Sequence, residues 1–210
     1  MGTYAITIAR GFGSGGRRIA SKLADELEIH SYENCILTLA AQYSGRDEHD
    51  FIEVDERLRG SYLSSQISKL QKHLLPRPQI EKFTSDDRLF QFQEQIIREL
   101  VKEESCIIVG KCADYVLRDY DNVLSVYIEA PRPYCLKQVM ERMNVTEEEA
   151  HQLITKTDKY RADYYKYYTG RKSWNNPTNY DLTLNSGRLG DEKCIAIIKN
   201  ALKVKLGVEV

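Results

Sequence analysis

Four glycines and two arginines stand close together near the start of the chain, in an order that suits phosphate binding. The segment reads Gly11-Phe12-Gly13-Ser14-Gly15-Gly16-Arg17-Arg18. Glycine has no Cβ and accepts positive φ, so successive backbone N–H groups can turn toward one anion. Arginines in the first turn of a helix face the positive end of its dipole, and a bound phosphate relieves that repulsion. Apart from Phe12, we therefore predict that these residues bind phosphate.

Spacing alone fits two kinds of nucleotide-binding loop. The glycines satisfy both the G-x-x-x-x-G pattern of P-loops and the G-x-G-x-x-G pattern of dinucleotide-binding folds. The second kind also needs an apolar strand that ends in an acidic residue about twenty residues further on. Glu33 suits that position, but residues 27–32 are too polar for the strand. A plain glycine-rich turn with solvated arginines is the third interpretation.

Composition and charge restrict the class of partner. The chain has 210 residues, 42% of them hydrophobic, which is enough for the core of one domain. Its 30 basic and 31 acidic residues leave a net charge of −1, so nothing draws it generally to nucleic acid or membranes. Five cysteines without a C-x-x-C pair favour reduced thiols. Without a membrane-length apolar run or a signal-peptide pattern, we expect a cytoplasmic protein with small-molecule partners.

Strand and helix patterns alternate along the chain. Apolar runs of strand length occur at residues 6–9, 106–109, 123–128 and 180–185. Helical spacing recurs at residues 19–27, 36–41, 89–101, 133–143 and 195–204. Thr146 and Glu149 form a capping-box pattern that starts one more helix. Strands separated by helices predict an α/β fold, with a parallel sheet of about five strands and helices on both faces.

Polar residues follow the predicted strands, at the edge where an open parallel sheet binds its ligands. Lys111 and Asp114 come directly after residues 106–109. They are suited to hold the phosphate and the base or sugar of a second substrate. The simpler interpretation is a helix N-terminus with solvated charges.

Residues 156–172 are rich in tyrosine and basic side chains. Tyr160, Tyr164 and Tyr168 share one helical face, which favours core packing for most of these rings. Arg161 and Arg171 suggest a different role, because a cationic helix that ends at a glycine suits a lid over phosphates. A solvated charged face is the alternative.

Together these motifs resemble the cytidylate kinase-like proteins, of the nucleoside monophosphate kinase group within the P-loop NTPases. The resemblance rests on residues 6–17, 109–117, 158–170 and 180–185, which keep the family order. It implies a three-layer P-loop kinase-like domain over residues 1–210. Within it, a helical insertion at 36–83 would bind the nucleoside monophosphate and a lid would span 156–179. It also implies ATP in the glycine loop with Mg²⁺, acceptor contacts from Lys111 and Asp114, and lid arginines at Arg161 and Arg171.

The loop departs from a standard P-loop at two positions. Arg17 stands where a lysine reaches the β- and γ-phosphates, and Arg18 where a serine or threonine hydroxyl ligates magnesium. The leading hypothesis is phosphoryl transfer from ATP to a nucleoside monophosphate, with Arg17, Arg161 and Arg171 as catalytic cations and the magnesium ligands unassigned. The second is a nucleotide-binding regulator with weak or no turnover. The third, a dinucleotide oxidoreductase, leaves the basic lid without a role.

Overall fold

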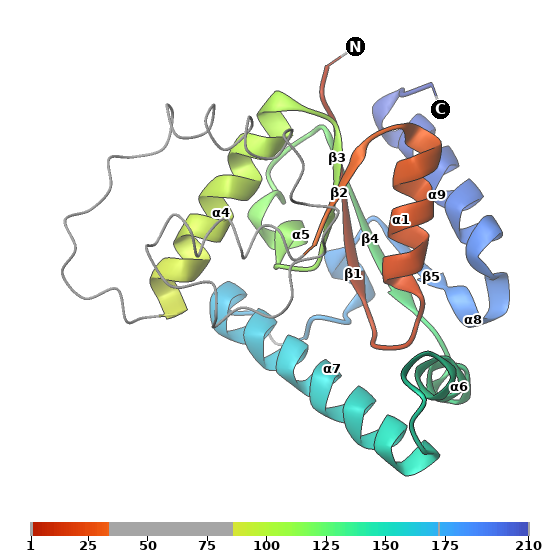
Figure 1. The fold of residues 1–210 in the computed structure, drawn as a ribbon. Helices are drawn as coiled ribbons and strands as arrows, with labels where there is room; N and C mark the ends of the chain where they lie inside the picture. The colour runs from red at the N-terminus through yellow and green to blue at the C-terminus, as the bar shows by residue number, and fades with distance from the viewer. Residues whose placement is uncertain (1, 34–85, 172, 210) are drawn as a thin grey trace, which may run out of the picture.

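One parallel sheet forms the centre of the protein, in a computed structural model that describes residues 2–33, 86–171 and 173–209 (Figure 1). Its strands are β1 (Ala5–Arg10), β2 (His30–Tyr32), β3 (Cys106–Val109), β4 (Val123–Glu129) and β5 (Leu182–Asn185). They are hydrogen-bonded in the order β2-β3-β1-β4-β5, and every pair is parallel. The predicted parallel sheet is confirmed. Its order differs from the 3-2-1-4-5-6 order of dinucleotide-binding sheets.

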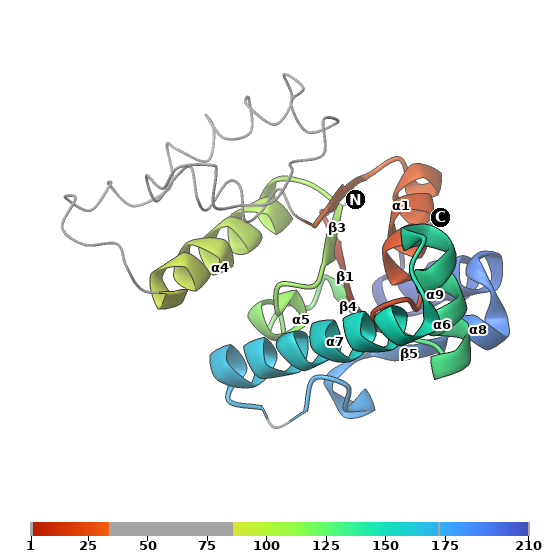
Figure 2. The ribbon, with the colours of Figure 1, turned by 60° about the horizontal axis from the view of Figure 1, so that its bottom comes forward.

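Helices cover both faces of this sheet. They are α1 (Gly16–Leu27), α4 (Asp86–Glu103), α5 (Ala113–Val116), α6 (Arg132–Met143), α7 (Glu147–Thr169), α8 (Ser186–Leu189) and α9 (Asp191–Leu206), with a 3₁₀ turn at Pro177–Asn179. Figure 1 shows α1 and α9 on one side of the sheet and α4 and α5 on the other. Helix α7 crosses the edge at which β1 turns into α1, and Figure 2 shows it lying across this edge beside α6.

Alternating strand residues build two hydrophobic cores, because successive side chains of a strand point to opposite faces. Ile6, Ile8 and Val126 pack with side chains of α1 and α9. Ala5 and Ile108 pack on the opposite face with side chains of α4, α5 and α7. The predicted three-layer arrangement is therefore confirmed.

The prediction that residues 27–32 would not form a strand is wrong. His30–Tyr32 forms β2 and pairs with Cys106–Ile108 of β3. The strand is only three residues long and lies at an edge of the sheet, and Tyr32 is its one buried residue. A short edge strand can be polar on its exposed side, so hydrophobic patterning does not reveal it.

The tyrosine face of α7 is only partly a core surface. Tyr168 stacks on Phe90 of α4 with 4.1 Å between ring centroids, and Tyr164 packs against the same ring. Tyr160 is 67% exposed, so core packing describes two of the three rings. The predicted helix at 36–41 and the insertion at 36–83 lie outside the described residues.

Two further observations bear on the expectations from composition. Cys106, Cys112, Cys135 and Cys194 are buried, and Cys112, Cys135 and Cys194 are free thiols. Within the described residues, no helix is both long enough and apolar enough to span a membrane.

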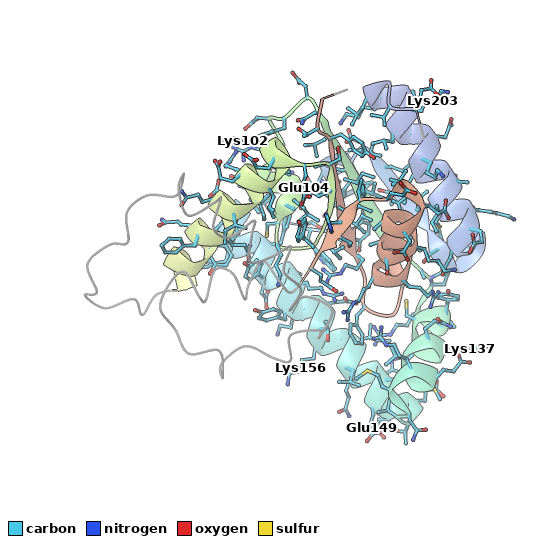
Figure 3. All side chains as sticks on the ribbon, turned by 45° about the horizontal axis from the view of Figure 1, so that its top comes forward. Lys102, Glu104, Lys137, Glu149, Lys156 and Lys203 are labelled. Carbon is cyan, nitrogen blue, oxygen red and sulfur yellow. The ribbon has the colours of Figure 1, made fainter. Side chains whose placement is uncertain are left out.

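The predicted capping box opens α7. The Thr146 hydroxyl accepts a hydrogen bond from Glu149 N at 3.3 Å, and the Glu149 carboxylate accepts one from Thr146 N at 2.8 Å. Figure 3 shows Glu149 at this end of α7, with Lys137 on the neighbouring α6.

Replacing Thr146 with alanine should lower the free energy of unfolding by about 1 kcal/mol, because the N-cap hydroxyl is lost. Urea denaturation of the full chain measures this. Thr146→Ser should keep most of the stability, and Ser21→Ala, within the exposed face of α1, serves as the control for loss of a hydroxyl. Equal stability of Thr146→Ala and the parent would contradict the capping role.

Candidate phosphate-binding site

The glycine loop connects the end of β1 to the start of α1, at the carboxyl edge of the sheet. Gly13 and Gly15 have φ of 85° and 81°, in the left-handed region that favours glycine. Among the residues that the structure describes, no side chain caps α1, and its first turn holds no acidic residue. The positive end of this helix is therefore suited to an anion.

Close neighbours also restrict the loop to residues without a Cβ. A Cβ built at Gly11 would lie 2.2 Å from Oε1 of Glu129, and one at Gly13 would lie 2.8 Å from the carbonyl oxygen of Cys135. The first contact is with the end of β4 and the second with α6. A Cβ at Gly13 would therefore clash with backbone, whereas one at Gly11 would require the end of the Glu129 side chain to shift.

The hydroxyl of Ser14 is used inside the loop. Ser14 is fully buried, and its Oγ donates to the carbonyl of Gly11 at 2.8 Å. Its own carbonyl accepts a hydrogen bond from Oγ of Ser186, the first residue of α8, at 2.5 Å. Ser14 thus stabilises the loop from within.

Arg17 and Arg18 point to different sides of α1. Nε of Arg17 lies 2.7 Å from Oε2 of Glu33, and the Arg17 side chain is 60% exposed. Arg18 forms two hydrogen bonds to Asp191 of α9, at 2.6 and 2.9 Å, and one to Gln138 of α6 at 3.0 Å. Arg18 therefore ties α1 to α9 and α6, whereas Arg17 lies on the side of β2.

A cavity of about 240 Å³ adjoins the loop on the Arg18 side. It is lined by Gly13, Gly15, Arg18, Gln138, Glu141 and Arg142. Arg142 also lies 5.5 Å from the ring of Phe12. A ligand in this cavity would contact the loop and α6 together.

Arg161 of α7 lies against the glycine loop. Its Nη1 donates to the carbonyl oxygen of Arg10 at 3.1 Å, and its guanidinium lies 5.5 Å from the ring of Phe12. One turn earlier, Asp158 accepts a hydrogen bond from Phe12 N at 2.8 Å. Burial, and next the charge of Arg10, lower the pKa of Arg161 to about 10, which leaves it cationic at neutral pH.

Arg171 follows the C-terminal end of α7, and that end lies eight residues, or about 12 Å along the helix axis, beyond Arg161. Its Nη1 donates to the hydroxyl of Tyr165 at 3.3 Å, and that hydroxyl donates to Asp114 at 2.8 Å. Burial raises the pKa of Asp114, while Tyr165 and Arg171 oppose that rise. Asp114 and Arg171 are thus brought together through Tyr165, at a place separate from the glycine loop.

Lys111 stands in a tight turn between β3 and α5. Gly110, Lys111 and Cys112 have φ of 75°, 60° and 54°, three successive residues in the left-handed region. The Lys111 carbonyl accepts a hydrogen bond from Gln93 of α4 at 3.1 Å, and Gln93 is fully buried. Such a conformation costs free energy in residues other than glycine, so the surrounding packing must hold it in place.

Arg10 and Asp158 contact the loop, although sequence patterns assign no role to either residue. Arg10 is the last residue of β1, so the rule that polar residues at strand ends line the site could have found it. Asp158 lies three residues before Arg161, but nothing in the sequence indicates that it reaches Phe12.

The described residues do not supply the magnesium ligand of a standard P-loop. Ser14 directs its hydroxyl to Gly11, and Arg18 occupies the position of the ligating hydroxyl and contacts Asp191. Within the described part of the chain, no group of three or more His, Cys, Asp or Glu residues could hold a metal ion. A protein-held magnesium site therefore does not fit this loop.

The strand order and the glycine loop define a P-loop α/β protein. A sequence model of the cytidylate kinase-like family matches residues 5–188, and the chain belongs to this family. Membership supports nucleotide-dependent phosphoryl transfer as the class of activity. No curated protein matches the sequence.

Solved structures share the fold over nearly the whole chain. An uncharacterized protein from Eubacterium ventriosum is 26% identical, with a TM-score of 0.69, covering 96% of this chain and 99% of its own. Shikimate kinase from Bacteroides thetaiotaomicron is 12% identical, with a TM-score of 0.50 and coverages of 95% and 98%. Shikimate kinase from Acinetobacter baumannii, in complex with shikimate, is 12% identical, with a TM-score of 0.50 and coverages of 97% and 96%. At 12% identity the two kinases show the fold alone.

Gly13→Ala should destabilise the protein more than Gly170→Ala. Both positions have positive φ, which costs about 1–3 kcal/mol in alanine. A Cβ at Gly170 meets nothing within 4 Å, whereas one at Gly13 meets a backbone carbonyl. Urea denaturation of both variants measures how much this contact contributes to the loss of stability. Equal losses in the free energy of unfolding would show that the loop shifts to accommodate a Cβ.

The ion pair between Arg18 and Asp191 should make stability depend on pH. The hydrogen bond from Arg18 lowers the pKa of Asp191 below its value of about 3.9 in the unfolded chain. The pair therefore stabilises the fold above about pH 4, and this stabilisation is lost as the pH falls through the lower folded-state pKa.

Asp191→Asn should accordingly be less stable than the parent at pH 7, and the difference should shrink below about pH 4. Denaturation across this range measures it. Asp119→Asn is the control, because Asp119 is 73% exposed in its pair with Arg118. A difference between Asp191→Asn and the parent that stays constant down to pH 2 would contradict this assignment.

Proposed function

We propose that the protein transfers a phosphoryl group from ATP to a nucleoside monophosphate. The observation that carries this proposal is the glycine loop at the N-terminus of α1, which no described side chain caps and whose first turn holds exposed Arg17, in a chain of a kinase-like family. The loop amides and Arg17 would hold the donor phosphates, as in other P-loop enzymes. Small-molecule nucleotides are then its partners. A cytoplasmic location belongs to the same proposal and is supported by the buried free thiols of Cys112, Cys135 and Cys194.

Positioning and fixed positive charge would supply the catalysis. The acceptor phosphate is already anionic, so the reaction needs no general base on the protein. Arg161, packed on the loop, would stabilise the charge on the transferring group. Magnesium would arrive with the nucleotide as part of the substrate MgATP, since Arg18 stands at the position of the ligating hydroxyl and Ser14 directs its own hydroxyl to Gly11.

Lys111, Asp114 and Arg171 are proposed to serve the acceptor side. The hydrogen bond from Tyr165 and the charge of Arg171 both favour the ionised form of Asp114, and they would hold its carboxylate as a fixed, orienting group there. For Arg171 to reach the transferring phosphate, the end of α7 would have to move toward the loop.

Replacing Arg17 with alanine should weaken ATP binding about tenfold or more, because one charge-assisted contact to phosphate is lost. It should also abolish transfer of labelled phosphate from ATP, with magnesium, to each of a panel of nucleoside monophosphates. Isothermal titration and product separation measure the two effects.

Arg118→Ala is the matched control, since Arg118 is exposed and pairs with Asp119 at 3.4 Å, outside the loop. A labelled diphosphate made by the parent and by this control identifies the kinase and its acceptor. ATP binding that depends on Arg17 without any product would favour the nucleotide-binding regulator. ATP binding unchanged in Arg17→Ala would overturn the phosphate-binding role of the loop.

A further inference from the structure

A single carboxylate joins two arginines beside the glycine loop. Oε1 of Glu33 lies 2.7 Å from Nη2 of Arg10, and Oε2 lies 2.7 Å from Nε of Arg17. Glu33 follows β2, Arg10 ends β1, and Arg17 lies in the first turn of α1. We call Arg10, Arg17 and Glu33 the carboxylate clamp.

The clamp is built into the edge of the sheet. The side chains of Arg10 and Glu33 are only 15% and 17% exposed. Nη1 of Arg10 lies 2.3 Å from where a Cβ of Gly110 would be, so the end of β3 accommodates the guanidinium only because it is glycine. Residues directly after β2 and β3, Glu33 and Gly110, therefore restrict the position of the Arg10 side chain.

Positive charge is concentrated at this place. Arg161 donates to the carbonyl of Arg10, and the charge of Arg10 contributes to its lowered pKa. Asp158 lies 3.5 Å from Nη1 of Arg161 and also accepts a hydrogen bond from Phe12 N. The anion that bridges Arg10 to Arg17 is thus supplied by Glu33.

We propose that the carboxylate clamp is the binding site for the phosphate monoester of the acceptor, and that this phosphate displaces Glu33. A guanidinium can bind two oxygens of a phosphate through parallel hydrogen bonds, as it binds the two oxygens of a carboxylate. A phosphate dianion carries more charge and one more terminal oxygen than the carboxylate it replaces. The inference rests on the proposed function for the identity of the acceptor.

The geometry favours the acceptor over the donor. Arg10, Glu33 and Gly110 lie on the β2 and β3 side of Arg17. The cavity beside Gly13 and Gly15 lies on the opposite side, toward α6 and α9. The turn from the glycine loop into α1 therefore lies between the cavity and the clamp, as phosphoryl transfer between a donor and an acceptor requires.

The test is isothermal titration of the full chain, saturated with ADP to fill the loop, with inorganic phosphate and with four ribonucleoside 5′-monophosphates. Glu33→Gln should bind the accepted monophosphate and inorganic phosphate about tenfold more tightly, because the competing charge is removed. Arg10→Gln should bind both about tenfold more weakly, and Arg10→Lys should recover only part of the loss.

Glu94→Gln is the matched control, because Glu94 pairs with Arg98 at 2.8 Å on α4, outside the clamp. It should leave each dissociation constant unchanged. Thermal unfolding of every variant shows that the variants being compared are folded, and Arg10→Lys preserves the charge if Arg10→Gln does not fold.

Unchanged monophosphate affinity in Glu33→Gln and Arg10→Lys, or no monophosphate binding by any variant, would overturn the inference. If these substitutions change the affinity for ATP more than that for ADP, and leave monophosphate affinity unchanged, the clamp binds the γ-phosphate of the donor instead. This result would also overturn the inference. If the expected shifts occur but no phosphoryl transfer is detected, the proposed function alone fails. Transfer by the parent without these shifts would refute the clamp alone.

Discussion

The arrangement of the site depends on how closely the backbone of the glycine loop approaches its neighbours. A Cβ at Gly16 would lie 2.6 Å from Cβ of Arg10, and one at Gly11 would meet Glu129. These contacts limit the paths that the chain can take from β1 into α1. Ser14 and Ser186 then fix that path with buried hydrogen bonds. Because the loop is held from both sides, its amides are oriented before any ligand binds.

This path places two adjacent arginines on different sides of the same helix turn. Side chains one residue apart on a helix do not face each other, so Arg17 and Arg18 must diverge. Arg18 is held by Asp191 and Gln138, and its contribution is to position α1 against α9 and α6. Arg17 stays exposed on the side of β2. The arginine that replaces the hydroxyl of a standard P-loop thus serves the structure, and its neighbour is the one suited to a ligand.

Local sequence patterns predicted most helices and strands. They could not predict the site in full, because its contacts join residues that are far apart in the sequence. The β1, loop and α1 sequence is contiguous, so periodicity and glycine spacing were sufficient to predict it. β2 was missed because a three-residue edge strand carries almost no pattern. The pairing of Arg10 with Glu33, and the packing of Arg161 on Arg10, depend on strand order and on the course of α7. Neither is encoded in the spacing of nearby residues, so the partners of the predicted arginines could not be predicted.

An arginine-rich loop also raises a problem of stability that the carboxylates solve. Arg10, Arg17 and Arg161 gather at one edge of the sheet, where their mutual repulsion would disfavour the folded chain. Glu33 and Asp158 offset that repulsion without a ligand. Any phosphate that binds at Arg10 and Arg17 must therefore compete with a carboxylate already in place. The affinity for that phosphate then reflects the difference between its binding free energy and that of the Glu33 carboxylate. This competition favours a dianionic phosphate over singly charged groups, so the site selects ligands by charge.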